Sequence, residues 1–320
     1  DSSMFSAANL KKVFSFDNLS NGANTADPVF ESYSIDSLTI EVGDTITADD
    51  LPVCTVTYND GTVVSDVVVS WESDASKQAI ADVNTKAASA DGRGIYNVPG
   101  IISVDNNGEK VNKNVNCKIV VEPQNIMING SFENDTAAPW KYTDGSENSI
   151  IGSGSGEGFP STNDPRTGSK SLHFYNTEAF EFEVYNDVTI DTPGYYAAEM
   201  YLQGGGSTAD KPENIKLVAT VGEDTKYESD NAYLNGWKSW NKMEIANIKI
   251  TQRMIDEGNN TVRVSLVAEN MPAKAWGSAD DAKLFFDKAL SEDDIKAYEV
   301  EKLIAKISYP RSEEHTSELQ

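Results

Sequence analysis

Basic residues, histidine and cysteine are scarce in this 320-residue chain, and each scarcity argues against a class of function. The 26 Lys and Arg stand against 51 Asp and Glu, so the formal net charge is −25. Such a field repels phosphate backbones and anionic lipid headgroups, which argues against nucleic acid and membrane surfaces as partners. No apolar run approaches the roughly 20 residues of a membrane span, so we expect no membrane insertion. A neutral ligand or a bound cation suits this charge better.

The small number of histidines argues against catalysis. The chain has two, and His315 lies in a terminal segment excluded below, so a Ser/His/Asp set would depend on His173 alone. Carboxylates are so abundant that no glycosidase-like pair stands out. The glycine-rich stretch 152–158 lacks the Lys-Ser or Lys-Thr of a phosphate loop, and we expect a mobile surface loop there. We therefore expect this chain to be non-catalytic.

The two cysteines, Cys54 and Cys117, lie in strand-like segments and share the phase of their apolar neighbours. Both side chains are therefore predicted to point inward. A buried disulfide across a sandwich is one interpretation, and it requires an oxidising compartment. Two buried thiols that act as small hydrophobic residues are the other.

Both ends of the chain suggest a fragment of a longer protein. The chain does not begin with Met and has no signal peptide, so we expect it to start inside a longer gene product, with residues 1–31 as a linker or the tail of a preceding module. Residues 311–320, RSEEHTSELQ, resemble the translation of a sequencing-library adapter. We exclude them from fold reasoning as an artefactual tail, and we expect the natural protein to continue past Pro310.

Residues 32–123 are predicted to form a small all-β domain. Several short segments alternate apolar and polar residues, and Asn59-Asp60-Gly61 marks a hairpin turn. The segments YNDGT, VVVSW and GIYNVPG resemble those of bacterial immunoglobulin-like domains, which implies a spacer of that fold. Trp71 at the end of VVVSW is expected to be a core residue between two sheets.

Residues 124–288 are predicted to form a larger all-β unit. Seven evenly spaced segments have strand character and are separated by Gly, Asn and Asp: 171–176, 180–190, 195–203, 214–222, 240–250, 260–270 and 281–286. This spacing is typical of a jelly-roll β-sandwich. Residues 289–310 follow with apolar residues at helical spacing behind a Ser291–Asp294 capping box, which predicts a short linker helix.

One outer sheet face of the larger unit is predicted to carry aromatic rings and hydrogen-bonding groups. If Leu172 and Phe174 face the core, then His173 and Tyr175 face outward. In the segment 195–203 the same alternation turns Glu199, Tyr201 and Gln203 outward. A sugar ring stacks its C–H face on an aromatic ring, while its hydroxyls need planar polar partners. The mixture therefore indicates a shallow carbohydrate-binding site.

A cation site is predicted where the two ends of the larger unit meet. The motif NGSFE is expected to pair with the late segment GSADD, which would bring Glu133 and Asp280 together. Two such carboxylates repel each other unless a hard cation lies between them, and oxygen ligands including turn carbonyls suit Ca²⁺. The predicted ligands are Ser131, Glu133, Lys170 and Asp280. A solvent-exposed acidic pair is the alternative.

The larger unit resembles a known family of sugar-binding domains. Segments such as NIMINGSFEND, DPRTGSKSLHFYN, YYAAEMYLQGG and WGSADDAKLF are similar to carbohydrate-binding module family 61, which binds β-1,4-galactan and is attached to secreted endo-β-1,4-galactanases of glycoside hydrolase family 53. The resemblance implies a secreted or cell-surface, monomeric module of a parent galactanase or related hydrolase. It implies these binding residues: Trp140, Arg166, Tyr175, Tyr201, Gln203, Trp237 and Trp276.

Other interpretations remain open at this stage. Arg166 could hold the loop at Asp164, and Trp240 is expected in the core because apolar residues alternate after it. Trp237 and Trp276 are equally compatible with structural roles. The segment DKALSEDDI also resembles the end of laminin-G-type lectin domains, so a cell-surface adhesin or structural stalk is the alternative function.

Overall fold

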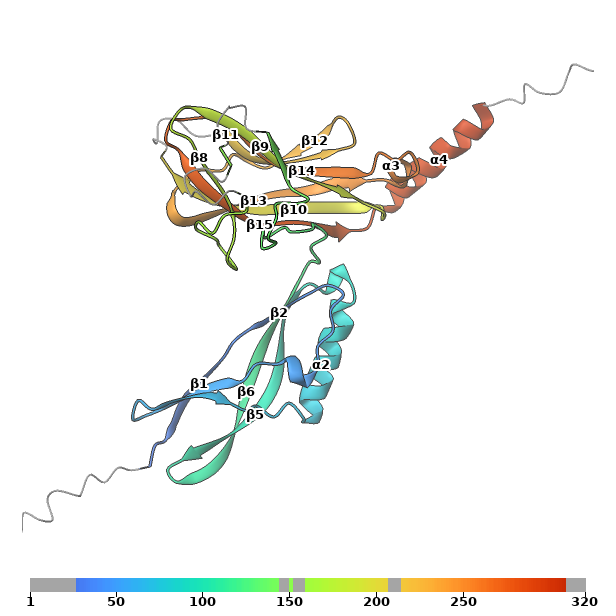
Figure 1. The fold of residues 1–320 in the computed structure, drawn as a ribbon. Helices are drawn as coiled ribbons and strands as arrows, with labels where there is room; N and C mark the ends of the chain where they lie inside the picture. The colour runs from blue at the N-terminus through green and yellow to red at the C-terminus, as the bar shows by residue number, and fades with distance from the viewer. Residues whose placement is uncertain (1–26, 144–149, 152–158, 207–213, 309–320) are drawn as a thin grey trace, which may run out of the picture. The chain divides into compact units, whose positions relative to one another are not determined.

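A computed structural model describes residues 27–143, 150–151, 159–206 and 214–308. The expected N-terminal linker lies mostly outside this range, and so do the glycine-rich stretch 152–158 and the tail 311–320. The chain divides into two compact units, residues 1–122 and 123–320, which are coloured blue to green and green to red in Figure 1. About half of the described residues lie in β-strands, far more than lie in helices in either unit, which confirms the predicted all-β class.

The first unit contains two three-stranded sheets, in the orders β1-β3-β4 and β2-β6-β5. Their strands are β1 (Phe30–Ile35), β2 (Leu38–Glu41), β3 (Cys54–Tyr58), β4 (Val63–Val67), β5 (Gly94–Asn106) and β6 (Glu109–Glu122). β2 and β6 are parallel, whereas the other pairs are antiparallel. The predicted turn at Asn59-Asp60-Gly61 joins β3 to β4, with Gly61 at a φ of 85°.

The core of the first unit lies between its two sheets. Burial alternates along β3, and Trp71 is 5% exposed, as predicted. A Cβ on Gly100 would lie 2.4 Å from the Trp71 ring, so only glycine allows this close approach. Cys54 and Cys117 are both buried free thiols, and burial raises the pKa of each. Of the two interpretations, the structure therefore contains the pair of small hydrophobic side chains.

A helix in the first unit is absent from the sequence prediction. α2 (Asp74–Ala87) begins after Ser73, whose side chain accepts a hydrogen bond from the Ser76 N–H, and the Ser76 hydroxyl donates to the Pro99 carbonyl at 2.7 Å. The helix buries mainly small residues, so its sequence shows little apolar periodicity. Two short 3₁₀ helices, η3 (Ala48–Asp50) and η4 (Ala90–Gly92), complete this unit.

The second unit is a β-sandwich of two sheets, in the orders β13-β10-β15-β8 and β12-β11-β14-β9-β7 (Figure 1). The strands are β7 (Lys141–Thr143), β8 (Leu172–Tyr175), β9 (Phe180–Thr189), β10 (Gly194–Gly205), β11 (Asn214–Val221), β12 (Thr225–Glu228), β13 (Gly236–Ile250), β14 (Thr261–Met271) and β15 (Trp276–Lys288). All seven predicted strands are present. The two that sequence reasoning missed, β7 and β12, are short strands at the edges of one sheet.

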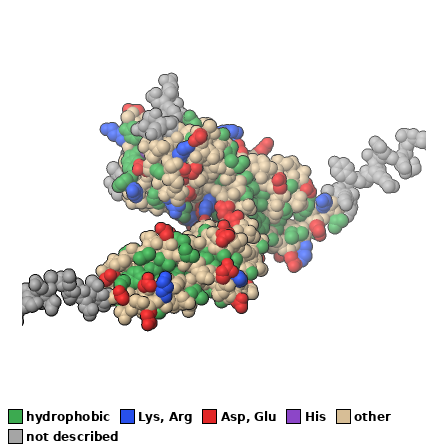
Figure 2. All heavy atoms as spheres, turned by 60° about the horizontal axis from the view of Figure 1, so that its bottom comes forward, with side chains coloured by type: hydrophobic (Ala, Val, Ile, Leu, Met, Phe, Trp, Pro, Cys, Tyr) green, Lys and Arg blue, Asp and Glu red, His purple; other side chains and the backbone are tan. Residues whose placement is uncertain are grey.

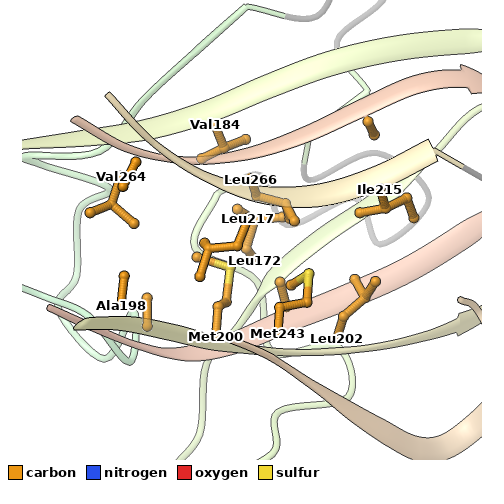
Figure 3. Packing of buried hydrophobic residues seen from close by; sticks show 14 of the residues in the cluster. Leu172, Val184, Ala198, Met200, Leu202, Ile215, Leu217, Met243, Val264 and Leu266 are labelled. Atoms are coloured by element: carbon orange, nitrogen blue, oxygen red, sulfur yellow. The ribbon is translucent and has the colours of Figure 1, made fainter. Parts of the chain in front are cut away.

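Side chains from both sheets fill the space between the layers of this sandwich (Figure 3). Ala198, Met200 and Leu202 of β10 are each at most 1% exposed, which confirms the predicted inward phase. Opposite them lie residues of β11 and β14, such as Leu217 and Leu266. In contrast to this apolar core, the surface carries many charged side chains, and Figure 2 shows acidic ones over both units.

The predicted linker helix is present as α4 (Glu292–Ser308). The Asp294 N–H donates to the Ser291 hydroxyl at 3.2 Å and the Ser291 N–H donates to the Asp294 carboxylate at 3.2 Å, so the capping box is confirmed. Asp294 also contacts Lys249 and Tyr195, which attaches the start of the helix to the sheet. A short helix, α3 (Gln252–Asp256), precedes β14. None of the described helices is long and apolar enough to span a membrane.

Candidate functional site

The strand register places the predicted site residues in rows across the outer face of the four-stranded sheet. Antiparallel pairing of β10, β15 and β8 sets opposed residues side by side, and outward-facing residues recur at every second position. The outward rows are Gly205, Trp276 and Tyr175; then Gln203, Ser278 and His173; then Tyr201 and Asp280. Residues from three strands are therefore assembled on one surface.

The segment 159–171 covers one end of this face. The Arg166 guanidinium lies 3.6 Å from the centre of the Tyr201 ring and forms a 2.6 Å ion pair with Asp281. The Thr167 hydroxyl donates to the same carboxylate at 2.6 Å. Arg166 therefore holds the segment against the sheet, which is the structural role left open for it, and its charge is already paired.

His173 is less accessible than predicted. Its phase is outward, but the side chain is buried at 7% exposure, and its Nδ1 lies 3.0 Å from the Ser278 hydroxyl. The Ser278 hydroxyl also donates to the Asn163 carbonyl at 3.3 Å, so the covering segment lies on this row. Burial lowers the pKa of His173, opposed by the nearby charge of Asp164. The expectation of an exposed histidine is therefore wrong, because the segment 159–171, which directly precedes β8, folds back over it.

Glu133 and Asp280 both bind the covering segment. Glu133 accepts hydrogen bonds from the N–H groups of Ser169 and Lys170, each at 2.9 Å, and Asp280 accepts from the N–H groups of Arg166 and Thr167 at 2.8 and 3.2 Å. Gly168 lies between these contacts at a φ of 59°, and a Cβ there would lie 2.4 Å from the Glu133 carboxylate. Two of the four predicted metal ligands, Glu133 and Asp280, thus position this loop.

The electrostatics of these two carboxylates differ. Burial raises the pKa of Asp280 to about 7, with a further contribution from the charge of Asp281, against the effect of three N–H donors. Burial also acts on Glu133, but hydrogen bonds from Lys170 and Ser169 outweigh it and lower the pKa. Asp280 is fully buried, and its hydrogen-bond donors are backbone N–H groups. A buried carboxylate that pairs with no cationic side chain among the described residues is compatible with a bound cation.

Other features of this region fit a cation less well. The Lys170 ammonium donates to the Glu133 carbonyl at 3.3 Å and to the Asp135 carboxylate at 2.9 Å, so a cationic group already contacts this turn. The described residues include no group of three or more His, Cys, Asp or Glu side chains that could hold a metal. A metal here would depend on backbone carbonyls as well as on Asp280.

The segment that precedes Glu133 runs beside β15 without forming a strand. The Ile126 N–H donates to the Leu284 carbonyl at 2.9 Å, and the Ala282 N–H donates to the Gly130 carbonyl at 2.9 Å. The expected contact between the two ends of the unit is therefore present, but its geometry is irregular.

The end of the face around Trp276 is aromatic and partly exposed. Trp237 is 61% exposed, and its indole N–H donates to the Asp164 carboxylate at 2.8 Å. The Trp276 ring lies over Gly205, since a Cβ added to Gly205 would lie 3.2 Å from the indole nitrogen. Tyr175 on β8 is the cross-strand neighbour of Trp276. Three of the predicted aromatic residues therefore lie along this end of the face.

Gln203 lies in the row beside these rings and has an unpaired donor. The side chain is fully buried, and its Oε1 accepts a hydrogen bond from the Lys238 N–H. This bond fixes the orientation of the amide, so the other group is Nε2, which has no hydrogen-bond partner. An unpaired buried donor costs roughly 1–3 kcal/mol.

Trp140 does not belong to this surface. It is 4% exposed, its ring centre lies 4.9 Å from that of Phe132, and its indole N–H donates to the Asn129 carbonyl at 2.8 Å. The turn at Asn129 folds the segment back and buries both rings. The prediction that Trp140 offers a sugar platform is therefore wrong.

Two contributions to the site were missed by sequence reasoning. The Lys238 N–H, which orients Gln203, is a backbone group and has no signature in the sequence. Ser278 contacts both His173 and the covering segment. Its position within GSADD was visible, but only the strand register shows that it faces outward.

Comparison with known proteins gives matches to solved structures alone, since no family model and no curated protein matches the chain. TmCBM61 in complex with β-1,4-galactotriose is 21% identical over 51% of this chain and 99% of its own, with a TM-score of 0.40. A structure of carbohydrate-binding modules from the β-sandwich superfamily is 11% identical over 81% and 97%, with a TM-score of 0.41. A cyclase from Fischerella sp. TAU is 13% identical over 52% and 98%, with a TM-score of 0.37.

Proposed function

We propose that the second unit is a non-catalytic carbohydrate-binding module for β-1,4-galactan or a related plant polysaccharide. The observation that carries this proposal is the exposed Trp237 ring next to the half-buried Trp276–Tyr175 row. Aromatic faces can stack on the C–H patch of a sugar ring. The galactan preference rests on the family resemblance of the sequence.

The proposal extends to the setting of the chain. A net charge of −25 leaves a neutral polysaccharide as a favourable partner and disfavours anionic polymers. We place the chain outside the cell as an accessory part of a secreted glycoside hydrolase, with the first unit as a spacer. The parent enzyme would then stay close to the polymer that it degrades.

Affinity electrophoresis tests the polysaccharide. In a native gel that contains potato galactan we expect the chain to migrate more slowly than in a gel without polymer, with a Kd between about 1 mM and 1 μM, which corresponds to roughly −4 to −8 kcal/mol. A gel with a β-glucan is the control for non-specific retardation. Unretarded migration in galactan would reject the proposal and favour the adhesin or stalk.

We also propose a structural Ca²⁺ ion held by Asp280 and Glu133 with carbonyl groups of Ser131 and Lys170. The support is the complete burial of Asp280 and the convergence of both carboxylates on one loop. The ion would supply a positive charge that stabilises the segment 159–171 against the sheet.

Chelation tests the ion through a thermal melt. At a free Ca²⁺ concentration of about 100 times the Kd, binding raises the free energy of unfolding by about 2.7 kcal/mol. For a unit of this size, that increase raises the melting temperature by about 5–10 °C. EDTA should remove that increase, and Asp280→Asn should melt at the same temperature with or without EDTA. An unchanged wild-type midpoint would reject the cation.

A further inference from the structure

The Trp237 ring is held by a residue that lies far from it in the sequence. Its indole N–H donates to the carboxylate of Asp164, in the segment 159–171, at 2.8 Å. The Lys238 ammonium lies over the ring, 4.5 Å from its centre, but a flexible lysine stem restrains its neighbour only weakly. Trp237 is 61% exposed, so packing contributes little to holding the ring. The hydrogen bond to Asp164 is therefore the contact best placed to restrain it.

The backbone on both sides of Asp164 is anchored independently of this ring. The Asn163 carbonyl accepts a hydrogen bond from the Ser171 hydroxyl at 2.6 Å. The Arg166 N–H donates to the buried Asp280 carboxylate at 2.8 Å. Because the segment is fixed at these two points, the restraint acts from the segment on the exposed indole, rather than from the indole on the segment.

The backbone at Asp164 limits which residues can occupy this position. Its φ of 49° lies in the left-handed region, which residues other than glycine adopt rarely and which Asp and Asn tolerate best. Both Asp and Asn have a side-chain oxygen that can accept a hydrogen bond from the indole N–H, whereas glycine has none. Asn and Gly are therefore the substitutions that keep the backbone and separate the effect of the acceptor.

The direction of the bond suits a stacking ring. The indole N–H lies in the plane of the ring, so Asp164 holds Trp237 by its edge, while a sugar would stack on a face. A side chain that is already ordered loses less rotational freedom when a ligand binds. A restraint at the edge can therefore raise the affinity without any contact with the sugar.

We propose that Asp164 is a positioning residue, which orients the Trp237 ring for stacking and does not itself bind the sugar. This inference rests on the proposed carbohydrate-binding function. It gives the segment 159–171 a part in binding, because the segment connects the anchor at Asp280 on β15 to the exposed ring on β13.

A measurement without sugar tests the restraint directly. The ¹H–¹⁵N heteronuclear NOE of the Trp237 indole reports the motion of the ring in the ¹⁵N-labelled full chain, and the signal is assigned by its absence in Trp237→Phe. We expect the NOE to fall in Asp164→Gly and to stay close to the wild-type value in Asp164→Asn, which keeps an acceptor oxygen. An unchanged NOE in Asp164→Gly would overturn the positioning role.

Isothermal titration with a galactan oligosaccharide tests the consequence for binding. Asp164→Gly should weaken the affinity by about 2- to 10-fold, which is the expected effect of releasing one ordered side chain. Asp164→Asn should stay within about twofold of the wild-type chain, since the hydrogen bond is kept.

A double-mutant cycle separates an indirect role from a direct one. Phenylalanine at position 237 cannot donate to Asp164, so Asp164→Gly should cause no further loss of affinity in Trp237→Phe. A further loss there would show that Asp164 acts on the sugar by another route and would contradict the positioning role. Absence of binding by the wild-type chain would instead reject the carbohydrate function, while the NOE comparison would still decide whether Asp164 restrains the ring.

Discussion

Trp237→Ala is expected to reduce galactan affinity by about 30-fold, which corresponds to about 2 kcal/mol. Its indole ring is 61% exposed at the open end of the face, where it can stack on a sugar, and aromatic anchors of this kind supply a large share of binding energy. Removal of the ring deletes this contact and the hydrogen bond to Asp164 together. Isothermal titration with a galactan oligosaccharide measures the change.

Trp237→Phe is the matched control for the same position. Phenylalanine keeps a stacking face but cannot donate to Asp164, so the expected loss is only about 2- to 10-fold. Neither change should alter stability by more than about 0.5 kcal/mol, because the side chain is mostly exposed. Equal affinity of the wild-type chain and Trp237→Ala would show that this ring does not bind the sugar.

Phe174→Ala is expected to destabilise the second unit by about 3–5 kcal/mol. The Phe174 ring is fully buried, and its centroid lies 4.9 Å from the centroid of the Phe182 ring. The packing is so close that a Cβ added to Gly277 would lie 2.3 Å from the Phe174 ring. Its removal leaves a cavity below the strands that carry the site. For a unit of this size the melting temperature should fall by about 6–20 °C.

Denaturant unfolding followed by tryptophan fluorescence measures this loss. All tryptophans except Trp71 lie in the second unit, so the signal reports mainly on it. Tyr175→Ala is the control, because Tyr175 is the next residue on β8 and faces the other side of the sheet. We expect less than about 1 kcal/mol for the control. A Phe174→Ala loss no larger than that of Tyr175→Ala would contradict the assigned packing.

Local patterns were sufficient for much of the fold. Alternation in period two predicted seven of the nine described strands of the sandwich, and Met200 and Leu202 point inward as the phase requires. The capping box at Ser291 predicted the start of the last helix. In contrast, α2 was missed because it packs through small residues, which give no strong apolar period.

The candidate site was only partly predictable. Its outward residues Tyr175, Tyr201 and Gln203 follow from strand phase, since alternation is a local property of the chain. The burial of His173 and the use of Arg166 as a clamp follow from the fold of the segment 159–171 over the sheet. No local pattern shows which loop covers which face.

The sequence by itself determined the all-β class, the acidic surface and the set of residues that face outward, because composition and alternation are properties of adjacent residues. The tertiary structure decided which of those residues stay accessible. Trp140 became a core residue, Glu133 and Asp280 came to hold one loop, and Gln203 kept an unpaired amide beside open rings. These outcomes depend on contacts between residues far apart in the chain, which only the packed sandwich specifies.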